Sequence, residues 1–192
     1  EFITIGGHTF NPGLLRNGYI LDIGCRGFDF SNYFPDKVTY CIDLDPEVFK
    51  NVSPSFNQIF LNLAISDKKG NGEYYENGEA TCLKQLYHYQ DHHIKPCKTI
   101  TMEDLYEITG ENVDLLKLDC EGAEYIILGE TFKPIPKQIT VEFHHHYVPD
   151  LHKQHYEKII ERLLKDYTMH NSVWEQRHGC GYNFWDTLFI RK

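Results

Sequence analysis

The fold is decided at Ile20-Leu21-Asp22-Ile23-Gly24-Cys25-Arg26-Gly27, where an apolar run ends in a turn that carries two glycines. Residues 19–23 have the length and apolar content of a buried strand. Gly24 and Gly27 permit a left-handed backbone and a close approach to a ligand, and ligands of open α/β sheets bind past the carboxyl ends of strands. The stretch predicts a strand followed by a ligand-binding turn. The plainer interpretation is that the glycines only shape a tight turn.

Further apolar runs follow along the chain and alternate with helical patterns. Strands are predicted at residues 38–42, 58–63, 113–118 and 138–143, and helices after Pro46, after Thr101, at 123–128 and around 156–164. Such alternation is typical of repeated βαβ units and a largely parallel sheet.

Two other regions complete the predicted fold. Residues 167–174 and 183–190 are predicted to be strands joined through Gly179-Cys180-Gly181, and so short a connection favours an antiparallel hairpin. Residues 66–98 have no clear period, and we expect turns and short strands over the carboxyl edge of the sheet. The predicted fold class is α/β: a Rossmann-like three-layer sandwich with a mostly parallel seven-strand sheet and a C-terminal antiparallel hairpin.

Size and composition indicate a single soluble domain over residues 1–192. The chain is 41% hydrophobic and 24% charged, and it is too short for two ordinary domains. It opens with Glu1-Phe2, a dipeptide that a common restriction site encodes, so we expect a cloning scar and a domain taken from a longer polypeptide. No apolar run is long enough to span a bilayer, and no secretory signal pattern is found.

Charge and cysteine usage narrow the expected partners and compartment. The net charge is −9, and no Lys/Arg cluster is found, which argues against nucleic acid and an anionic membrane as partners. The six cysteines include no Cys-x-x-Cys pair, and several, such as Cys41, lie in apolar runs. Buried cysteines without paired spacing predict a reducing, cytoplasmic setting and no disulfide.

The first turn favours a nucleoside ligand. Asp43 ends the next predicted strand, about 20 residues on, where a carboxylate can accept hydrogen bonds from ribose hydroxyls. The Gly-x-Gly-x-x-Gly fingerprint of dinucleotide binders is absent, with Arg26 in the loop. Asp22 suits an ammonium group and would repel a pyrophosphate. These features favour S-adenosylmethionine; the plainer alternative is that Asp43 only caps a helix.

Three segments of the chain resemble the FkbM family of S-adenosylmethionine-dependent methyltransferases. The densest match is residues 113–124, VDLLKLDCEGAE, supported by residues 63–70, LAISDKKG, and residues 141–144, VEFH. The similarity extends over roughly residues 18–190. The first motif departs from the family, because Arg26 and an early Gly27 replace a longer glycine-containing loop.

The resemblance implies a class I methyltransferase fold and a set of cofactor contacts. The residues that it places around S-adenosylmethionine are Asp22, Gly24, Cys25, Arg26, Gly27, Asp43, Leu44, Ala64, Ile65, Ser66, Asp67 and Asp119. It also places Asp119 and Glu121 beside the transferred methyl group.

Methyl transfer to a hydroxyl needs a base or a metal to assist loss of the proton. The candidate catalytic residues follow the fourth and fifth predicted strands, which we expect to be neighbours: Asp119, Glu121, Glu142 and His144. Glu121 has a second interpretation, stabilisation of the next helix N-terminus. Asp119, Glu142 and His144 are also candidate metal ligands; carboxylates favour magnesium, and histidine favours a transition metal. A metal-free general base is the slightly preferred alternative.

Other histidines carry weaker signals. The run His144-His145-His146 is more typical of solvent-facing loop residues than of a zinc site. His88, His92 and His93 are expected at the surface or in a lid over the acceptor site.

The predicted function is O-methylation of a sugar, a glycan or a glycosylated small molecule, since such acceptors are frequent in the family that the chain resembles. Fusion to other domains, such as glycosyltransferases, is also expected. Two alternatives remain open: an NAD-dependent Rossmann oxidoreductase, and a non-catalytic module that binds S-adenosylmethionine.

Overall fold

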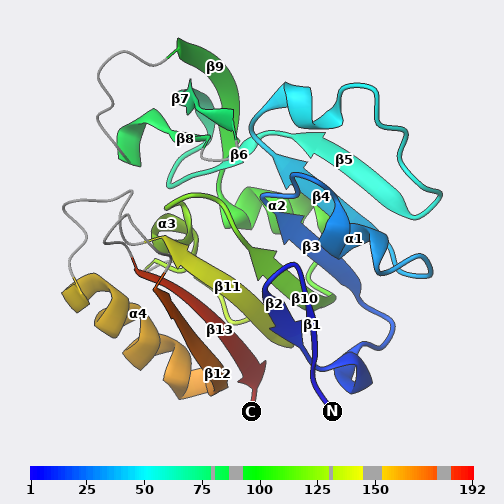
Figure 1. Ribbon diagram of the computed structural model, residues 1–192, viewed down its shortest axis with the longest axis vertical. Helices are drawn as coiled ribbons and strands as arrows, with labels where there is room; N and C mark the ends of the chain where they lie inside the picture. Colours follow the sequence, from blue (N-terminus) through cyan, green and yellow to red (C-terminus); the bar gives the residue numbers. More distant parts are fainter. Residues whose placement is uncertain (79–80, 87–92, 130–131, 145–152, 177–182) are drawn as a thin grey trace.

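The computed structural model describes residues 1–78, 81–86, 93–129, 132–144, 153–176 and 183–192. A central sheet has a hairpin against one face and helices against the other, and a second sheet lies at its carboxyl edge (Figure 1). The central strands are β3 (Tyr19–Ile23), β4 (Thr39–Asp43), β5 (Gln58–Asn62), β10 (Val113–Leu118), β11 (Gln138–His144), β12 (Tyr167–Gln176) and β13 (Asn183–Arg191).

The order of these strands confirms a mostly parallel seven-strand sheet. It runs β12-β13-β11-β10-β3-β4-β5. Strands β11 to β5 are parallel, whereas β13 is antiparallel to both β11 and β12. The residues predicted to connect β12 and β13, 179–181, lie outside the described part of the chain. The chain moves outward from β3 to β5 and then returns to β10, so strand order reverses between β3 and β10, where open α/β sheets bind ligands.

Side chains of the central strands alternate between two cores. Leu21 and Leu116 belong to the larger core, shared with α2 (Met102–Thr109), α3 (Glu124–Ile127) and α4 (Lys153–Asp166). Ile20 and Leu115 face the other way and pack with Phe10. That outer layer consists of β1 (Ile3–Ile5), β2 (His8–Phe10), the 3₁₀ turn η1 (Pro12–Leu14) and α1 (Asp29–Asn32). The sandwich therefore has three layers, one of them mainly a β-hairpin with a single-turn helix.

Of the helix starts predicted at Thr101 and Pro46, the first is confirmed and the second is wrong. Helix α2 begins at a capping box, in which the Asp104 N–H donates to Thr101 Oγ1 at 3.1 Å and the Thr101 N–H donates to Asp104 Oδ2 at 2.9 Å. It ends at Gly110, as predicted. Pro46, in contrast, opens only the 3₁₀ turn η2 (Pro46–Phe49). The predicted helix there was wrong, because the chain turns away at Asn51 with a left-handed φ of 62°.

Residues 64–100 contain a second sheet of order β6-β9-β7-β8. Its strands are β6 (Ala64–Ile65), β7 (Gly70–Glu76), β8 (Cys82–Leu83) and β9 (His93–Ile100). The 3₁₀ turn η4 (Lys84–Leu86) follows β8 directly. β7 and β9 are longer than the short strands predicted here. They pair antiparallel along their lengths, and this long-range pairing supplies the order that the local pattern lacks.

Two further expectations concern membrane-spanning segments and disulfides. In the described ranges, no helix combines the length and apolar character that crossing a membrane requires. Cys25, Cys41, Cys82, Cys97 and Cys120 are free thiols, whereas Cys180 lies outside the described residues.

Candidate active site

A cavity of about 510 Å³ opens at the carboxyl edge of the sheet, beside the junction of β3 and β10. This volume is typical of cofactor and small-molecule sites. The predicted site residues that line it are Gly24, Arg26, Gly27, Asp43, Leu44, Ala64, Ile65, Asp119, Glu121, Glu142 and His144. The sequence motifs far apart in the chain therefore converge on one cavity.

Gly24 brings the ends of β3 and β10 into contact. Its φ is +80°, and a Cβ atom at this position would lie 1.6 Å from the carbonyl oxygen of Asp119. Both the backbone conformation and the lack of space exclude a side chain. Gly24 therefore shapes the turn and also fixes Asp119 at the cavity wall.

Asp43 lies at the end of β4 and is oriented by its own turn. Its Oδ1 accepts a hydrogen bond from the Asp45 N–H at 2.9 Å, and Asp45 Oδ2 pairs with Arg26 at 2.7 Å. Burial raises the pKa of Asp43 to about 6, against the opposing effects of the Asp45 N–H and the Arg26 guanidinium. Asp43 thus stabilises a turn and also lines the cavity.

Asp22 lies beneath the cavity rather than on its wall. It is the register partner of Lys117 on β10, and its Oδ1 lies 3.1 Å from Lys117 Nζ. Burial disfavours the charged Lys117, but the carboxylates of Asp22 and Asp119 raise the pKa of Lys117 above its ordinary value. Lys117 also lies 3.6 Å from Asp119 Oδ2, so it links Asp22 to the site.

The four predicted catalytic residues meet at one wall of the cavity. Nε2 of His144 lies 3.7 Å from Asp119 Oδ1. The same atom lies 3.6 Å from Glu121 Oε2 and 3.6 Å from Glu142 Oε1. These distances exceed those of ordinary hydrogen bonds, so three carboxylate groups surround His144 Nε2 at ion-pair distance. The arrangement follows from the predicted adjacency of β10 and β11, which pair in parallel.

Glu124 supports this wall, although it was not among the predicted site residues. Its buried carboxylate accepts hydrogen bonds from the N–H groups of Cys120 at 2.8 Å and Gly122 at 2.9 Å. Its Oε1 also lies 3.0 Å from His144 Nδ1. An acidic residue at a helix start was the available signal. Glu124 thus binds the free N–H groups before α3, the task that the plainer interpretation gave to Glu121.

Burial among charged neighbours shifts the pKa values of these groups. Burial would lower the pKa of His144, but Glu124, Glu121 and Asp119 raise it to about 10. Burial raises the pKa of Glu121 to about 7, which His144 partly opposes. Burial would also raise the pKa of Asp119, but Lys117 and His8 hold it well below its usual range.

Glu121 also has an uncommon backbone conformation. Its φ is +53°, a left-handed value that few residues other than glycine adopt. Strain of this kind is concentrated at functional sites, where the surrounding structure enforces it. The turn therefore presents the Glu121 carboxylate to the cavity.

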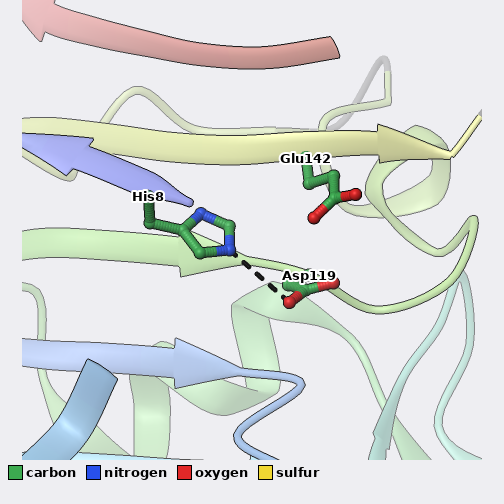
Figure 2. A group of neighbouring side chains, drawn as sticks. All are labelled: His8, Asp119 and Glu142. Atoms are coloured by element: carbon green, nitrogen blue, oxygen red, sulfur yellow. Dashed lines mark hydrogen bonds and ion pairs between the residues drawn. The ribbon is translucent and has the colours of Figure 1, made fainter. Parts of the chain in front are cut away.

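His8 approaches Asp119 from the N-terminal hairpin and lines a smaller cavity beside the large one (Figure 2). Its Nε2 lies 3.5 Å from Asp119 Oδ2, and its Nδ1 lies 3.4 Å from Thr140 Oγ1. The sequence around His8 carries no motif that predicts this position. The contact arises because β2 packs against β11 and β13.

The remaining predicted residues lie elsewhere. Cys25 and Asp22 line a smaller cavity of about 90 Å³. Ser66 donates to Asp67 Oδ1 at 3.0 Å and accepts from Gln85 Nε2 at 3.1 Å. His93 is exposed on β9. His144, which opens the run expected to face solvent, is instead buried on β11. The other predicted surface histidines lie outside the described residues: His88, His92, His145 and His146.

Comparisons with known proteins bear on this site. The model of the FkbM methyltransferase domain matches residues 23–184. No curated protein sequence matches the chain.

Three solved structures resemble the fold at low sequence identity. Methyltransferase FkbM from Methylobacillus flagellatus KT has 10% identity and a TM-score of 0.49, covering 94% of this chain and 46% of that chain. The Methanococcus jannaschii fibrillarin pre-rRNA processing protein has 14% identity and a TM-score of 0.53, covering 100% of this chain and 83% of that one. M. capricolum TrmK in complex with S-adenosyl-homocysteine has 11% identity and a TM-score of 0.46, covering 95% and 69%.

The present chain spans less than half the length of the Methylobacillus protein. The FkbM domain model covers the cavity-lining residues from Ile23 to His144. The chain belongs to the FkbM family of S-adenosylmethionine-dependent methyltransferases.

Proposed function

We propose that the chain transfers the methyl group of S-adenosylmethionine to a hydroxyl of a sugar, a glycan or a glycosylated small molecule. The observation that carries the proposal is the composition of the large cavity. The wall around Asp43 suits a nucleoside, and the wall across the junction of β3 and β10 consists of carboxylates and a histidine.

The cavity fits the cofactor in polarity as well as in size. The Asp43 carboxylate is placed to accept hydrogen bonds from ribose hydroxyls, and Leu44, Ala64 and Ile65 offer an apolar wall to the adenine. Gly24 and Gly27 have no side chains, so the backbone of the first turn can approach the methionine portion closely. The negative charge of Asp119 and Glu121 suits a cationic sulfonium.

The acceptor side of the cavity suits a hydroxyl. S-adenosylmethionine supplies an electrophilic methyl carbon when bound. As the acceptor oxygen bonds to that carbon and the carbon–sulfur bond breaks, the hydroxyl proton must leave, and we assign it to the Glu121 carboxylate because the strained turn directs this group into the cavity. Carboxylates and histidine also orient sugar hydroxyls through hydrogen bonds. The net charge of −9 disfavours a nucleic-acid acceptor.

The test is methyl transfer to a panel of sugars and glycosides, followed by mass spectrometry of acceptor and cofactor. We expect one acceptor to gain a methyl group with an equal amount of S-adenosylhomocysteine formed. Glu121→Gln should lower turnover by about 10²-fold or more and leave S-adenosylhomocysteine affinity nearly unchanged. Glu107→Gln, at an exposed position on α2 outside the cavity lining, is the matched control. Cofactor binding without turnover on any acceptor would instead favour the non-catalytic module, and tight NADH binding would favour the oxidoreductase.

We also propose a reducing, cytoplasmic location and fusion to further domains such as a glycosyltransferase. The free thiols of the described cysteines, three of them buried, support the first point. The second point stays a prediction from the sequence.

A further inference from the structure

We propose that His8, Asp119 and Glu142 bind a divalent transition-metal cation, so that the N-terminal hairpin completes a metal site at the wall of the methyltransferase cavity. Figure 2 shows the three side chains converging from β2, from the turn after β10 and from β11. His8 precedes the stretch matched by the FkbM domain model, residues 23–184. Binding of the cation stands on this geometry, whereas its role in catalysis rests on the proposed function.

The spacing of the donor atoms fits coordination. One ligand atom from each residue lies within 4.8 Å of the others, and the distance from His8 Nε2 to Asp119 Oδ2 is 3.5 Å. Ligands about 2.1 Å from one metal ion lie about 3.0–3.4 Å apart at adjacent positions and about 4.2 Å apart at opposite ones. The distance between His8 Nε2 and Asp119 Oδ2 is longer than that of most hydrogen bonds and close to the separation of adjacent ligands around one ion.

Both histidines at this wall are oriented as metal ligands usually are. A metal-binding histidine presents one ring nitrogen to the ion and uses the other to contact an orienting oxygen. The Nδ1 atom of His8 faces Thr140 Oγ1 at 3.4 Å, which leaves Nε2 directed at Asp119. The Nδ1 atom of His144 faces Glu124 at 3.0 Å. His144 Nε2 lies 3.7 Å from Oδ1 of Asp119, the carboxylate oxygen that His8 does not contact.

The local charge favours a cation. Lys117 and Asp22 form a close pair at 3.1 Å and balance each other. Four carboxylates surround the two histidines: Asp119, Glu121, Glu124 and Glu142. Lys117 also lies 3.6 Å from Asp119 Oδ2, yet several carboxylates gathered at one wall attract a divalent cation.

The donor set also indicates which cation. One imidazole with two carboxylates suits Mn²⁺, Fe²⁺ or Zn²⁺ better than Mg²⁺, which prefers oxygen ligands alone. Asp119 and Glu142 line the large cavity, so an ion held by them can take the acceptor hydroxyl oxygen as a further ligand and lower its pKa. In that step the oxygen–carbon bond forms, the carbon–sulfur bond breaks and the hydroxyl proton passes to Glu121.

Titration of the full chain with Mn²⁺, followed by electron paramagnetic resonance and calorimetry, tests the site. We expect one bound Mn²⁺ per chain. His8→Gln and Glu142→Gln should each weaken binding at least tenfold, and Thr140→Val, which removes only the orienting oxygen, about tenfold. His155→Gln is the matched control, because it replaces an exposed histidine on α4. Thermal unfolding by circular dichroism verifies that each variant is folded.

Two measurements separate this inference from the proposed function. The metal site is refuted if Mn²⁺ does not bind, or if it binds folded His8→Gln as tightly as the parent. The proposed methyltransferase function stands in that case if S-adenosylhomocysteine binds and methyl transfer continues undiminished in EDTA. If Mn²⁺ binds and is lost in His8→Gln, the site is established even where no acceptor is methylated. Restored turnover on adding Mn²⁺ to EDTA-treated enzyme would establish its catalytic role.

Discussion

Replacing Lys117 with Met tests how the charge pair beneath the site contributes to stability. The 3.1 Å between Lys117 Nζ and Asp22 Oδ1 corresponds to an attraction of about 5 kcal/mol at an effective dielectric constant of about 20. Burial of both charges offsets much of this attraction. Lys117→Met leaves Asp22, whose side chain is 1% exposed, without this partner. We expect the free energy of unfolding to fall by about 3–5 kcal/mol.

Urea unfolding of Lys117→Met, Asp22→Leu and the double variant measures this effect. The double variant replaces the pair with apolar groups, and we expect its free energy of unfolding to lie within about 2 kcal/mol of the parent. Lys98→Met, at an exposed position on β9, is the control and should change stability by less than about 0.5 kcal/mol. The reasoning is refuted if Lys117→Met costs less than about 1 kcal/mol, or if the double variant loses the sum of both single losses.

Three further predictions concern the turns at the cavity. Gly24→Ala should lower the free energy of unfolding by about 3 kcal/mol or more in urea unfolding, because the added Cβ meets the Asp119 carbonyl. Gly78→Ala is the control: Gly78 has a left-handed φ but open space around it, so its replacement should cost only about 1 kcal/mol. Equal losses in the two variants would contradict the clash. Asp43→Ala should weaken S-adenosylhomocysteine binding by about 1–3 kcal/mol in calorimetry, and unchanged affinity would remove Asp43 from the site. Since the pKa of Asp43 is about 6 and the ionised form accepts the ribose hydroxyls, parental affinity should fall about tenfold per pH unit below pH 6; a flat profile from pH 5 to 7 would contradict this role.

The sequence predicted those parts of the site that follow from strand order. Gly24, Asp43, Asp119 and His144 lie at or just past strand ends, and parallel strands bring such positions to one edge. The placement of Asp22 was less clear, because a strand residue next to a turn can face either side. Its register partner Lys117 is a charged residue within an apolar strand, and such a residue could have indicated that Asp22 has a buried ion-pair partner.

His8 and the second sheet depend on contacts between distant segments. No local sequence pattern predicts that the N-terminal hairpin packs against β11, or that β7 and β9 pair. The single outer hairpin layer has the same origin, since Phe10 joins a core with Ile20 and Leu115 only once the chain is folded.

A crystal structure of the chain with S-adenosylhomocysteine would show whether the large cavity is the cofactor site. We expect the ribose hydroxyls in hydrogen-bond contact with Asp43 and the cofactor sulfur facing the turn that carries Asp119 and Glu121, within the cavity at the junction of β3 and β10. A cofactor bound outside this cavity, or one whose sulfur faces away from that turn, would contradict it.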